Sequence, residues 1–174
     1  MEAKSANTLS LEEGRLQFIE LWGKLGSAWG ITRTMAQIHA LLLMATRPMN
    51  ADEIMAALQI SRGNVNMNLR GLIDWGLVYK SLKPGERKEF FTAEKDIAQV
   101  IKCIIAERKK RELEPLIKAL TPLSDIKGDD ADTIEFKNTI ENIQRFSQKA
   151  DSTLERLSKA DSNWLINGFL NMIH

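Results

Sequence analysis

Hydrophobic side chains recur at steps of three and four residues through most of the chain, which predicts helices buried along one side. The first such stretch begins near Ser10, which together with Glu13 has the spacing of a capping box. A second helix is expected from about Arg33 to Thr46, since Pro48 disfavours a helical residue before it. The apolar stripe of the first helix is Leu11, Phe18, Trp22, Leu25 and Trp29.

Two short helices are expected next, separated by a tight break. Asn50 and Glu53 can cap the first, which runs through Leu58. Ser61 can cap the second, which runs to about Trp75, because its hydroxyl can accept from a free amide of the first turn. The pattern therefore predicts a pair of helices that bury side chains against each other.

A β-hairpin is predicted directly after these helices. Residues 77–82 and 88–92 are short β-branched or aromatic runs, and Pro84-Gly85 lies at the centre of the turn between them. Helix, tight turn, helix and hairpin together indicate a helix-turn-helix with a wing. Gln59 lies in the helix-to-helix turn, where many such motifs carry Gly, and weakens this signature without removing it.

The remaining chain also has helical periodicity. A long charged helix is expected over 94–120, bent or broken near Pro115, followed by a polar loop over 122–132. An apolar helix over 164–173 is expected at the end. Between loop and end, a coiled-coil-like seam is formed by Phe136, Ile140, Ile143, Ser147, Ala150, Leu154 and Leu157.

The predicted fold is mainly α: a winged helix-turn-helix with flanking N- and C-terminal dimerisation helices. We expect an N-terminal helix over 1–31, the winged domain over 32–93 and a helical dimerisation region over 94–174. The flanking stripes hold more apolar surface than one small winged domain needs, and a recognition helix is usually presented twice by a homodimer. Intramolecular packing is the alternative use of these stripes.

The second helix of the pair has side chains suited to double-stranded DNA. The buried side of this helix carries Val65, Leu69 and Leu72. The opposite side carries Arg and Asn, which can make paired hydrogen bonds to guanine and adenine in the major groove. The helix start suits phosphates, and basic residues of the wing can reach the backbone or the minor groove. The exposed side also includes Gly71. The predicted DNA contacts are Ser61, Arg62, Gly63, Asn64, Asn66, Met67, Arg70, Lys83, Arg87 and Lys88. The alternatives are a solvated helix face or a winged-helix scaffold that binds proteins.

Charge supports a localised DNA site. The chain has 24 Lys and Arg against 23 Asp and Glu, which excludes a strongly basic tail. Residues 61–92 nevertheless hold six basic and three acidic residues, a net charge of +3. Cys103, the single cysteine, excludes a disulfide framework. With a polar N-terminus and no apolar stretch long enough to span a bilayer, the sequence predicts a cytoplasmic protein.

Catalysis, metal binding and cofactors are not expected. His39 and His174 are too few for a histidine metal site or a catalytic triad, and phosphate-cradling glycine loops are absent from the sequence. Trp22 and Trp29 are candidates for an aromatic cage around a quaternary ammonium ligand, although tryptophans at helical spacing usually belong to the core. Cys103 could be redox-active, but its apolar neighbours favour packing.

Residues 18–96 resemble the GbsR group of MarR-like transcriptional regulators. The resemblance lies in Phe18-Ile19-Glu20, Trp22-Gly23, Ser61-Arg62-Gly63-Asn64 and Pro84-Gly85-Glu86-Arg87-Lys88. It implies a homodimeric winged-helix repressor on a pseudo-palindromic operator. Several members of the group control osmoprotectant uptake or synthesis, glycine betaine among them, and some respond to choline. The wing departs from the usual Asp-x-Arg tip, because Glu86-Arg87 stands there.

Overall fold

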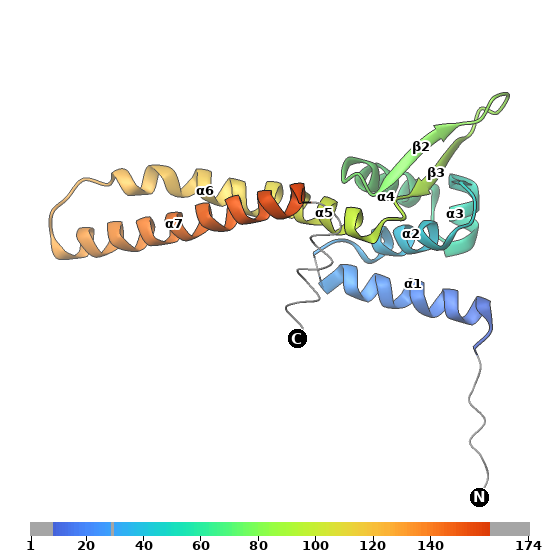
Figure 1. Cartoon of the computed structure of the whole chain (residues 1–174), viewed down its shortest axis with the longest axis horizontal. Helices are drawn as coiled ribbons and strands as arrows, with labels where there is room; N and C mark the ends of the chain where they lie inside the picture. Colours follow the sequence, from blue (N-terminus) through green and yellow to red (C-terminus); the bar gives the residue numbers. More distant parts are fainter. Residues whose placement is uncertain (1–8, 29, 161–174) are drawn as a thin grey trace, which may run out of the picture. The chain divides into compact units, whose positions relative to one another are not determined.

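The computed structural model describes residues 9–28 and 30–160, and these form two compact units divided between Lys95 and Asp96 (Figure 1). The first unit contains helices α1 to α4 and a small sheet, and the second contains helices only. Each unit has its own packing and is considered separately.

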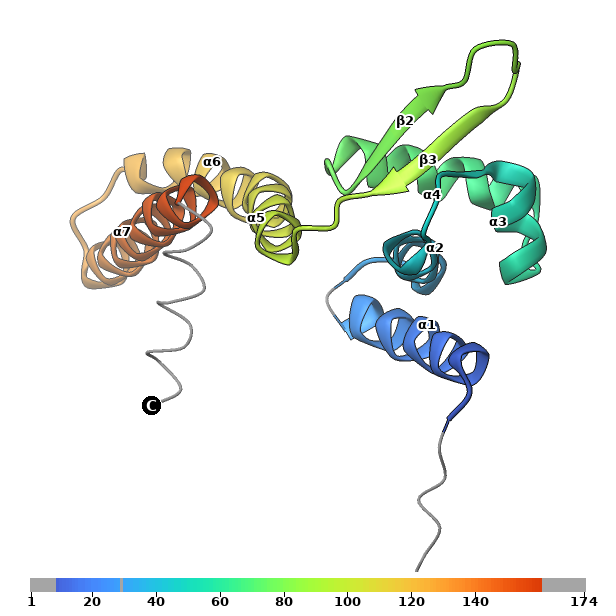
Figure 2. The same cartoon turned by 45° about the vertical axis from the view of Figure 1, so that its right-hand side comes forward.

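The N-terminal pair consists of α1 (Leu11–Ala28) and α2 (Arg33–Met44), which pack side by side (Figure 2). The predicted capping box starts α1: the amide of Glu13 donates to the Ser10 hydroxyl at 3.2 Å, and the Ser10 amide donates to the Glu13 carboxylate at 2.8 Å. At Gly26 an added Cβ would lie 2.4 Å from the Ala36 Cβ. The glycines of α1 therefore mark a close approach of the two helices.

The predicted apolar stripe of α1 is wrong at two of its positions. Leu11 is 71% exposed and Leu25 38% exposed, whereas Ile19, Gly23 and Gly26 are buried. The contact with α2 runs along the glycines because they let the backbones approach, and the large leucines are therefore turned away from this contact. Phe18 and Trp22 lie beside it and are half-buried. Trp29 lies outside the described residues.

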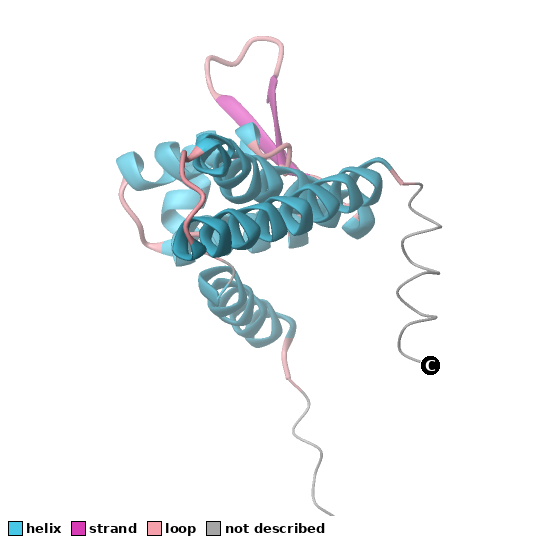
Figure 3. Ribbon diagram, turned by 90° about the vertical axis from the view of Figure 1, so that its left-hand side faces the viewer, coloured by secondary structure: helices cyan, strands magenta, loops and turns pink. Residues whose placement is uncertain are grey.

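The winged part follows the predicted order. It consists of β1 (Met49–Asn50), α3 (Ala51–Leu58), α4 (Arg62–Asp74), β2 (Val78–Leu82) and β3 (Glu89–Ala93). The antiparallel strands lie in the order β1-β3-β2, with Lys80 of β2 opposite Phe91 and Met49 of β1 opposite Phe91 on the other side. The strands of the hairpin are coloured magenta in Figure 3. Strand β1 was not predicted, because two residues are too few to show a period. The fully buried core includes Ile38, Leu42, Ile54, Val65, Leu69, Leu72, Leu77 and Val78.

The second unit is a pair of antiparallel helical segments. The outgoing segment is α5 (Ile97–Arg108), a π-helical turn (Lys109–Leu113) and α6 (Glu114–Leu120), followed by a 3-10 turn (Thr121–Asp125). The returning helix is α7 (Ala131–Lys159). The predicted irregularity near Pro115 is present as the π turn just before it, since Pro115 has no N–H to continue the regular ladder.

The predicted seam of α7 is only partly buried in this unit. Ile140 and Ser147 are buried, whereas Phe136 and Ile143 are 40% and 41% exposed. The expected loop after Pro122 is shorter than predicted, because the 3-10 turn extends to Asp125 and α7 begins at Ala131. The predicted apolar helix over 164–173 lies outside the described residues.

Candidate DNA-binding surface

The start of α4, the recognition helix, is held by a tight turn and a cap. Gln59 adopts a left-handed conformation with φ of 53°, and Ser61 accepts a hydrogen bond from the Asn64 amide at 3.3 Å. At Gly63 an added Cβ would have no atom of the described chain within 4 Å. The surface of α4 beside Gly63 is therefore open, so a phosphate can approach the start of the helix there.

The recognition helix separates a buried side from an exposed side. Val65, Leu69 and Leu72 are buried, as the sequence predicts. The exposed side does not include Gly71, because a Cβ there would lie 3.3 Å from the Met35 methyl group. Met67 is 63% exposed. The exposed residues of this side are Arg62, Gly63, Asn66, Met67 and Arg70.

A buried asparagine that the sequence analysis missed orients one predicted contact. Asn68 is 4% exposed, and its Nδ2 donates to the Asn64 carbonyl at 2.8 Å and to the Asn64 Oδ1 at 2.7 Å. The Thr32 hydroxyl donates to the Asn68 Oδ1 at 2.9 Å. Asn64 is thus half-buried and held by Asn68, whereas Asn66 is exposed. The signal in the sequence was the pair of asparagines four residues apart.

The wing is a basic hairpin next to the recognition helix. Its turn has Gly85 at φ of 80°, and the Glu86 amide donates to the Lys83 carbonyl at 3.1 Å. The Lys83 ammonium lies 4.0 Å from the centroid of the Phe90 ring, a cation–π distance. Arg87 and Lys88 are exposed and lie just before the returning strand. The predicted turn and the predicted basic residues therefore lie together on one projecting element.

One carboxylate connects the two parts of this surface. Asp52, in the first turn of α3, accepts from the Arg62 guanidinium with one oxygen and from the Lys88 ammonium at 3.0 Å with the other. The hydrogen bond from Lys88 and the positive charge of Arg62 lower the pKa of Asp52. A cavity of about 300 Å³ lies between these groups, lined also by Asn66 and Arg87. Asp52 gives no functional signal in the sequence, because an acidic residue in a first helical turn has an ordinary local role.

The aromatic candidate Trp22 is engaged within the protein. Its indole N–H donates to Nδ1 of His39 at 3.2 Å, and its ring lies 5.3 Å from the ring of Phe18. His39 is 3% exposed, and burial, reinforced by the charge of Lys95, lowers its pKa to about 4. The other candidate, Trp29, lies outside the described residues.

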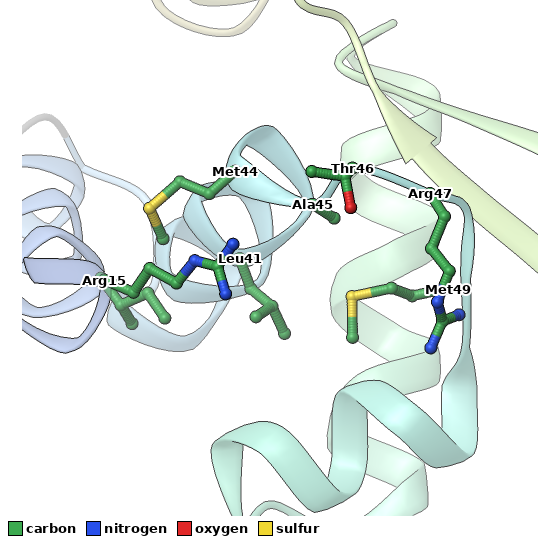
Figure 4. Close-up of a pocket in the computed structure, with 8 residues that line it drawn as sticks. Arg15, Leu41, Met44, Ala45, Thr46, Arg47 and Met49 are labelled. Carbon is green, nitrogen blue, oxygen red and sulfur yellow. The ribbon is translucent and has the colours of Figure 1, made fainter. Parts of the chain in front are cut away.

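A separate pocket of about 210 Å³ lies between α1 and the end of α2 (Figure 4). Arg47 pairs with Glu53 at 2.7 Å, whereas Arg15 contributes an exposed guanidinium. Two cations on an apolar lining suit a small anion better than an ammonium ion. The lining residues are Arg15, Ile19, Leu41, Met44, Ala45, Thr46, Arg47 and Met49.

Residues 9–28 and 30–160 also bear on metal binding and membrane insertion. In that part of the chain, His, Cys, Asp and Glu residues form no group of three that could hold a metal ion. Helices of the same part are too short or too polar to cross a bilayer.

Comparisons with known proteins agree with this geometry. Residues 29–89, which contain the helix-turn-helix and most of the wing, match the MarR family. A solved structure described as a transcriptional regulator superimposes with a TM-score of 0.56 and 22% identity, covering 84% of this chain and 99% of that one. The winged part of this chain is therefore similar to the MarR family, and the fold of the chain resembles that of the solved regulator.

Two curated proteins of one organism are also similar to this chain. The HTH-type transcriptional repressor GbsR of Bacillus subtilis (strain 168) is 25% identical over 156 residues, which are 90% of this chain and 84% of that protein. The putative HTH-type transcriptional regulator YvaV of the same organism is 25% identical over 89 residues, 51% of this chain and half of that protein. The similarity to GbsR thus extends well beyond the winged part.

Proposed function

We propose that this regulator is a ligand-responsive homodimeric repressor that binds a pseudo-palindromic operator and controls osmoprotectant genes. The observation that carries the DNA-binding proposal is the capped recognition helix, whose exposed Arg, Asn and Met side chains lie beside a basic wing in one unit. The repressor assignment is supported by the similarity to GbsR along 90% of the chain.

The proposed DNA contacts fall into three groups. Ser61, Arg62 and the Gly63 backbone hold phosphates at the start of α4. Arg70 and Asn66 read base edges, and Met67 contacts the C5-methyl group of a thymine. Asn64 contributes through its amide N–H groups, since its oxygen accepts from Asn68. The wing residues Lys83, Arg87 and Lys88 contact the backbone or the minor groove.

The proposed dimer surface uses the flanking regions, 1–31 and 94–174, on either side of the winged domain over 32–93. Large apolar side chains are exposed on α1, where Leu16 is 60% and Leu21 63% exposed. On α7, Phe146 is 74% exposed. A second copy that covers these side chains would remove their cost in water and present two recognition helices to one operator.

The proposed effector is a small quaternary ammonium compound such as choline, as members of the GbsR group suggest. Trp22 and Trp29 are the proposed aromatic contacts. Because the indole N–H of Trp22 is taken by His39, Trp22 would offer only its ring face to a cation. The arginine-lined pocket is a poor site for the same ligand, since its charges repel ammonium ions.

The DNA-binding proposal is tested with the double variant Arg70→Ala, Arg87→Ala. We expect operator affinity to fall by at least about a hundredfold, because a bidentate base contact and a wing contact are lost in each subunit. The salt dependence should also become shallower, since fewer phosphates are neutralised. Fluorescence anisotropy on an operator selected from random duplexes, across a salt series, measures both quantities.

The matched control is Arg145→Ala, Arg156→Ala, which removes the same charge from exposed positions of α7. Full affinity in the first variant, or equal loss in both, would contradict the proposed surface. The effector is tested in the same assay, where choline should weaken operator binding. Titration calorimetry without heat would remove the choline assignment and leave the DNA-binding proposal in place.

A further inference from the structure

The carboxylate of Asp52 lies among the proposed phosphate contacts, where a negative charge does not increase the affinity for DNA. Its side chain lies between Arg62 at the start of the recognition helix and Lys88 of the wing, two of the proposed phosphate contacts. A fixed negative charge at this position repels the phosphate backbone and reduces the positive charge that attracts it. The ion pairs also contribute little to folding, because all three side chains are at least 41% exposed.

The geometry of the three groups indicates a different role. Asp52 joins three elements, because it belongs to α3, Arg62 begins α4 and Lys88 begins the return of the hairpin. Each oxygen of the carboxylate takes one cation. A guanidinium has five N–H donors and an ammonium three, so both cations keep donors for a phosphate while they remain paired.

The charge of Asp52 is maintained at physiological pH. Its cationic neighbours hold its pKa below the ordinary range, and the start of α3 favours a negative charge. The cavity of about 300 Å³ between Asp52, Arg62 and Lys88 leaves room for a phosphate or for ordered water beside the pair. The arrangement therefore fixes the distance between the helix start and the wing without closing the space next to them.

We infer that Asp52 is a specificity-determining positioning residue, which holds Arg62 and Lys88 at one spacing and opposes binding to DNA that does not fit it. This inference rests on the proposed DNA-binding function. On an operator, whose backbone matches the fixed spacing, the held cations bind without being reorganised. On other DNA the cations cannot move apart freely, and the carboxylate repels the misplaced phosphate.

The test is Asp52→Asn, which keeps the size of the side chain and removes its charge. We expect affinity for non-operator duplexes to rise about tenfold, and its salt dependence to become steeper by about one ion per subunit. Operator affinity should stay unchanged or fall, so that discrimination between operator and scrambled duplexes drops about tenfold. Asp52→Glu, which restores the charge and the two oxygens, should recover most of the discrimination.

The matched control is Glu89→Gln, which neutralises a carboxylate of the same wing that pairs with Lys80 at 2.8 Å. In Glu89→Gln we expect the affinities for operator and non-operator duplexes to rise by the same factor, so that their ratio stays unchanged. Discrimination equal to wild type in Asp52→Asn, or an equal loss in Glu89→Gln, would overturn the inference. A wild-type protein that selects no operator at all would overturn the proposed function itself, and circular dichroism on each variant separates these results from misfolding.

Discussion

His39 is a buried imidazole whose protonation state is fixed by its neighbour. Because the Trp22 indole donates to Nδ1, the neutral ring carries its proton on Nε2, which has no hydrogen-bond partner among the described residues. A second proton would have to displace the Trp22 donor in a buried site near the Lys95 ammonium. Burial and this charge lower the pKa to about 4. The contact between α1 and α2 therefore depends on a neutral His39.

This arrangement predicts a loss of stability in mild acid. The folded pKa of about 4 lies below the ordinary value of 6.5, so the unfolded chain binds the proton first as pH falls. The contribution of His39 is complete above pH 6.5 and is lost towards pH 4, by up to about 3 kcal/mol in the free energy of unfolding. Urea titrations between pH 4 and 7.5 measure it.

The matched variant is His39→Asn, whose side-chain oxygen can accept from Trp22 but does not titrate. Carboxylates titrate in both proteins, so the difference between the two pH profiles isolates the histidine. We expect that difference to shrink by the same amount as pH falls from 6.5 to 4. Parallel profiles across this range would contradict the role of His39.

At the residue scale, the exposed side chains proposed to contact DNA could be predicted from the sequence, whereas the residues that hydrogen-bond to them could not. Arg70 and Asn66 follow from the helical wheel, because Val65, Leu69 and Leu72 define the buried side. Asn68 does not follow, since its burial depends on Thr32, which is 36 residues away in the chain. Asp52 is missed for the same reason, because Lys88 reaches it from another element.

The turn between α3 and α4 contains a non-glycine residue with positive φ. Gln59 ends α3 in the left-handed region at φ of 53°, where a Cβ is crowded by the following carbonyl. The turn is retained because the Ile60 amide donates to the Met55 carbonyl at 3.3 Å and the core holds both helices. With Gln59 in place of the usual glycine, the turn keeps its shape but has a higher conformational energy.

We predict that Gln59→Gly stabilises the protein. Relief of the left-handed strain gives about 1–2 kcal/mol, and the greater freedom of glycine in the unfolded chain takes back about 0.5–1 kcal/mol. The net gain in the free energy of unfolding should be about 0.5–1 kcal/mol in urea denaturation at pH 7. Gln59→Ala, which keeps the Cβ, is the control and should give no gain. Equal stability of Gly and Ala variants would show that this strain is absent.

Elements with a local signal could be predicted, and those fixed by distant contacts could not. The caps at Ser10, Asn50 and Ser61 and the turn at Gly85 are present as expected, because each depends on residues a few positions apart. The buried side of α1 was assigned incorrectly, since glycines give no hydrophobic signal although they allow the closest contact. Periodicity detects large side chains and misses close backbone packing.

At the scale of the whole molecule, α7 has an apolar side that the second unit leaves exposed. With the buried Ile140 and Ser147 as reference, Phe136, Ile143 and Phe146 fall within about 80° of one another on the helical wheel. This band adjoins the buried line and continues it on one side of the helix. The second unit thus buries only part of the seven-residue seam of α7. This partial burial is expected if a second copy of the chain covers the exposed remainder.

We predict that Phe146→Asp prevents dimerisation. Burial of a Phe side chain gives about 1.5–3 kcal/mol, and a two-fold dimer would bury it twice, so the dissociation constant should rise at least about a hundredfold. Gln148→Asp, exposed on the opposite side of α7, adds the same charge and should remain dimeric. Sedimentation equilibrium at micromolar concentration measures both, and anisotropy should show that the monomeric variant loses operator affinity because it presents one recognition helix instead of two. If Phe146→Asp dimerises like the wild type, this side of α7 lies outside the interface and the proposed dimer surface must be placed elsewhere.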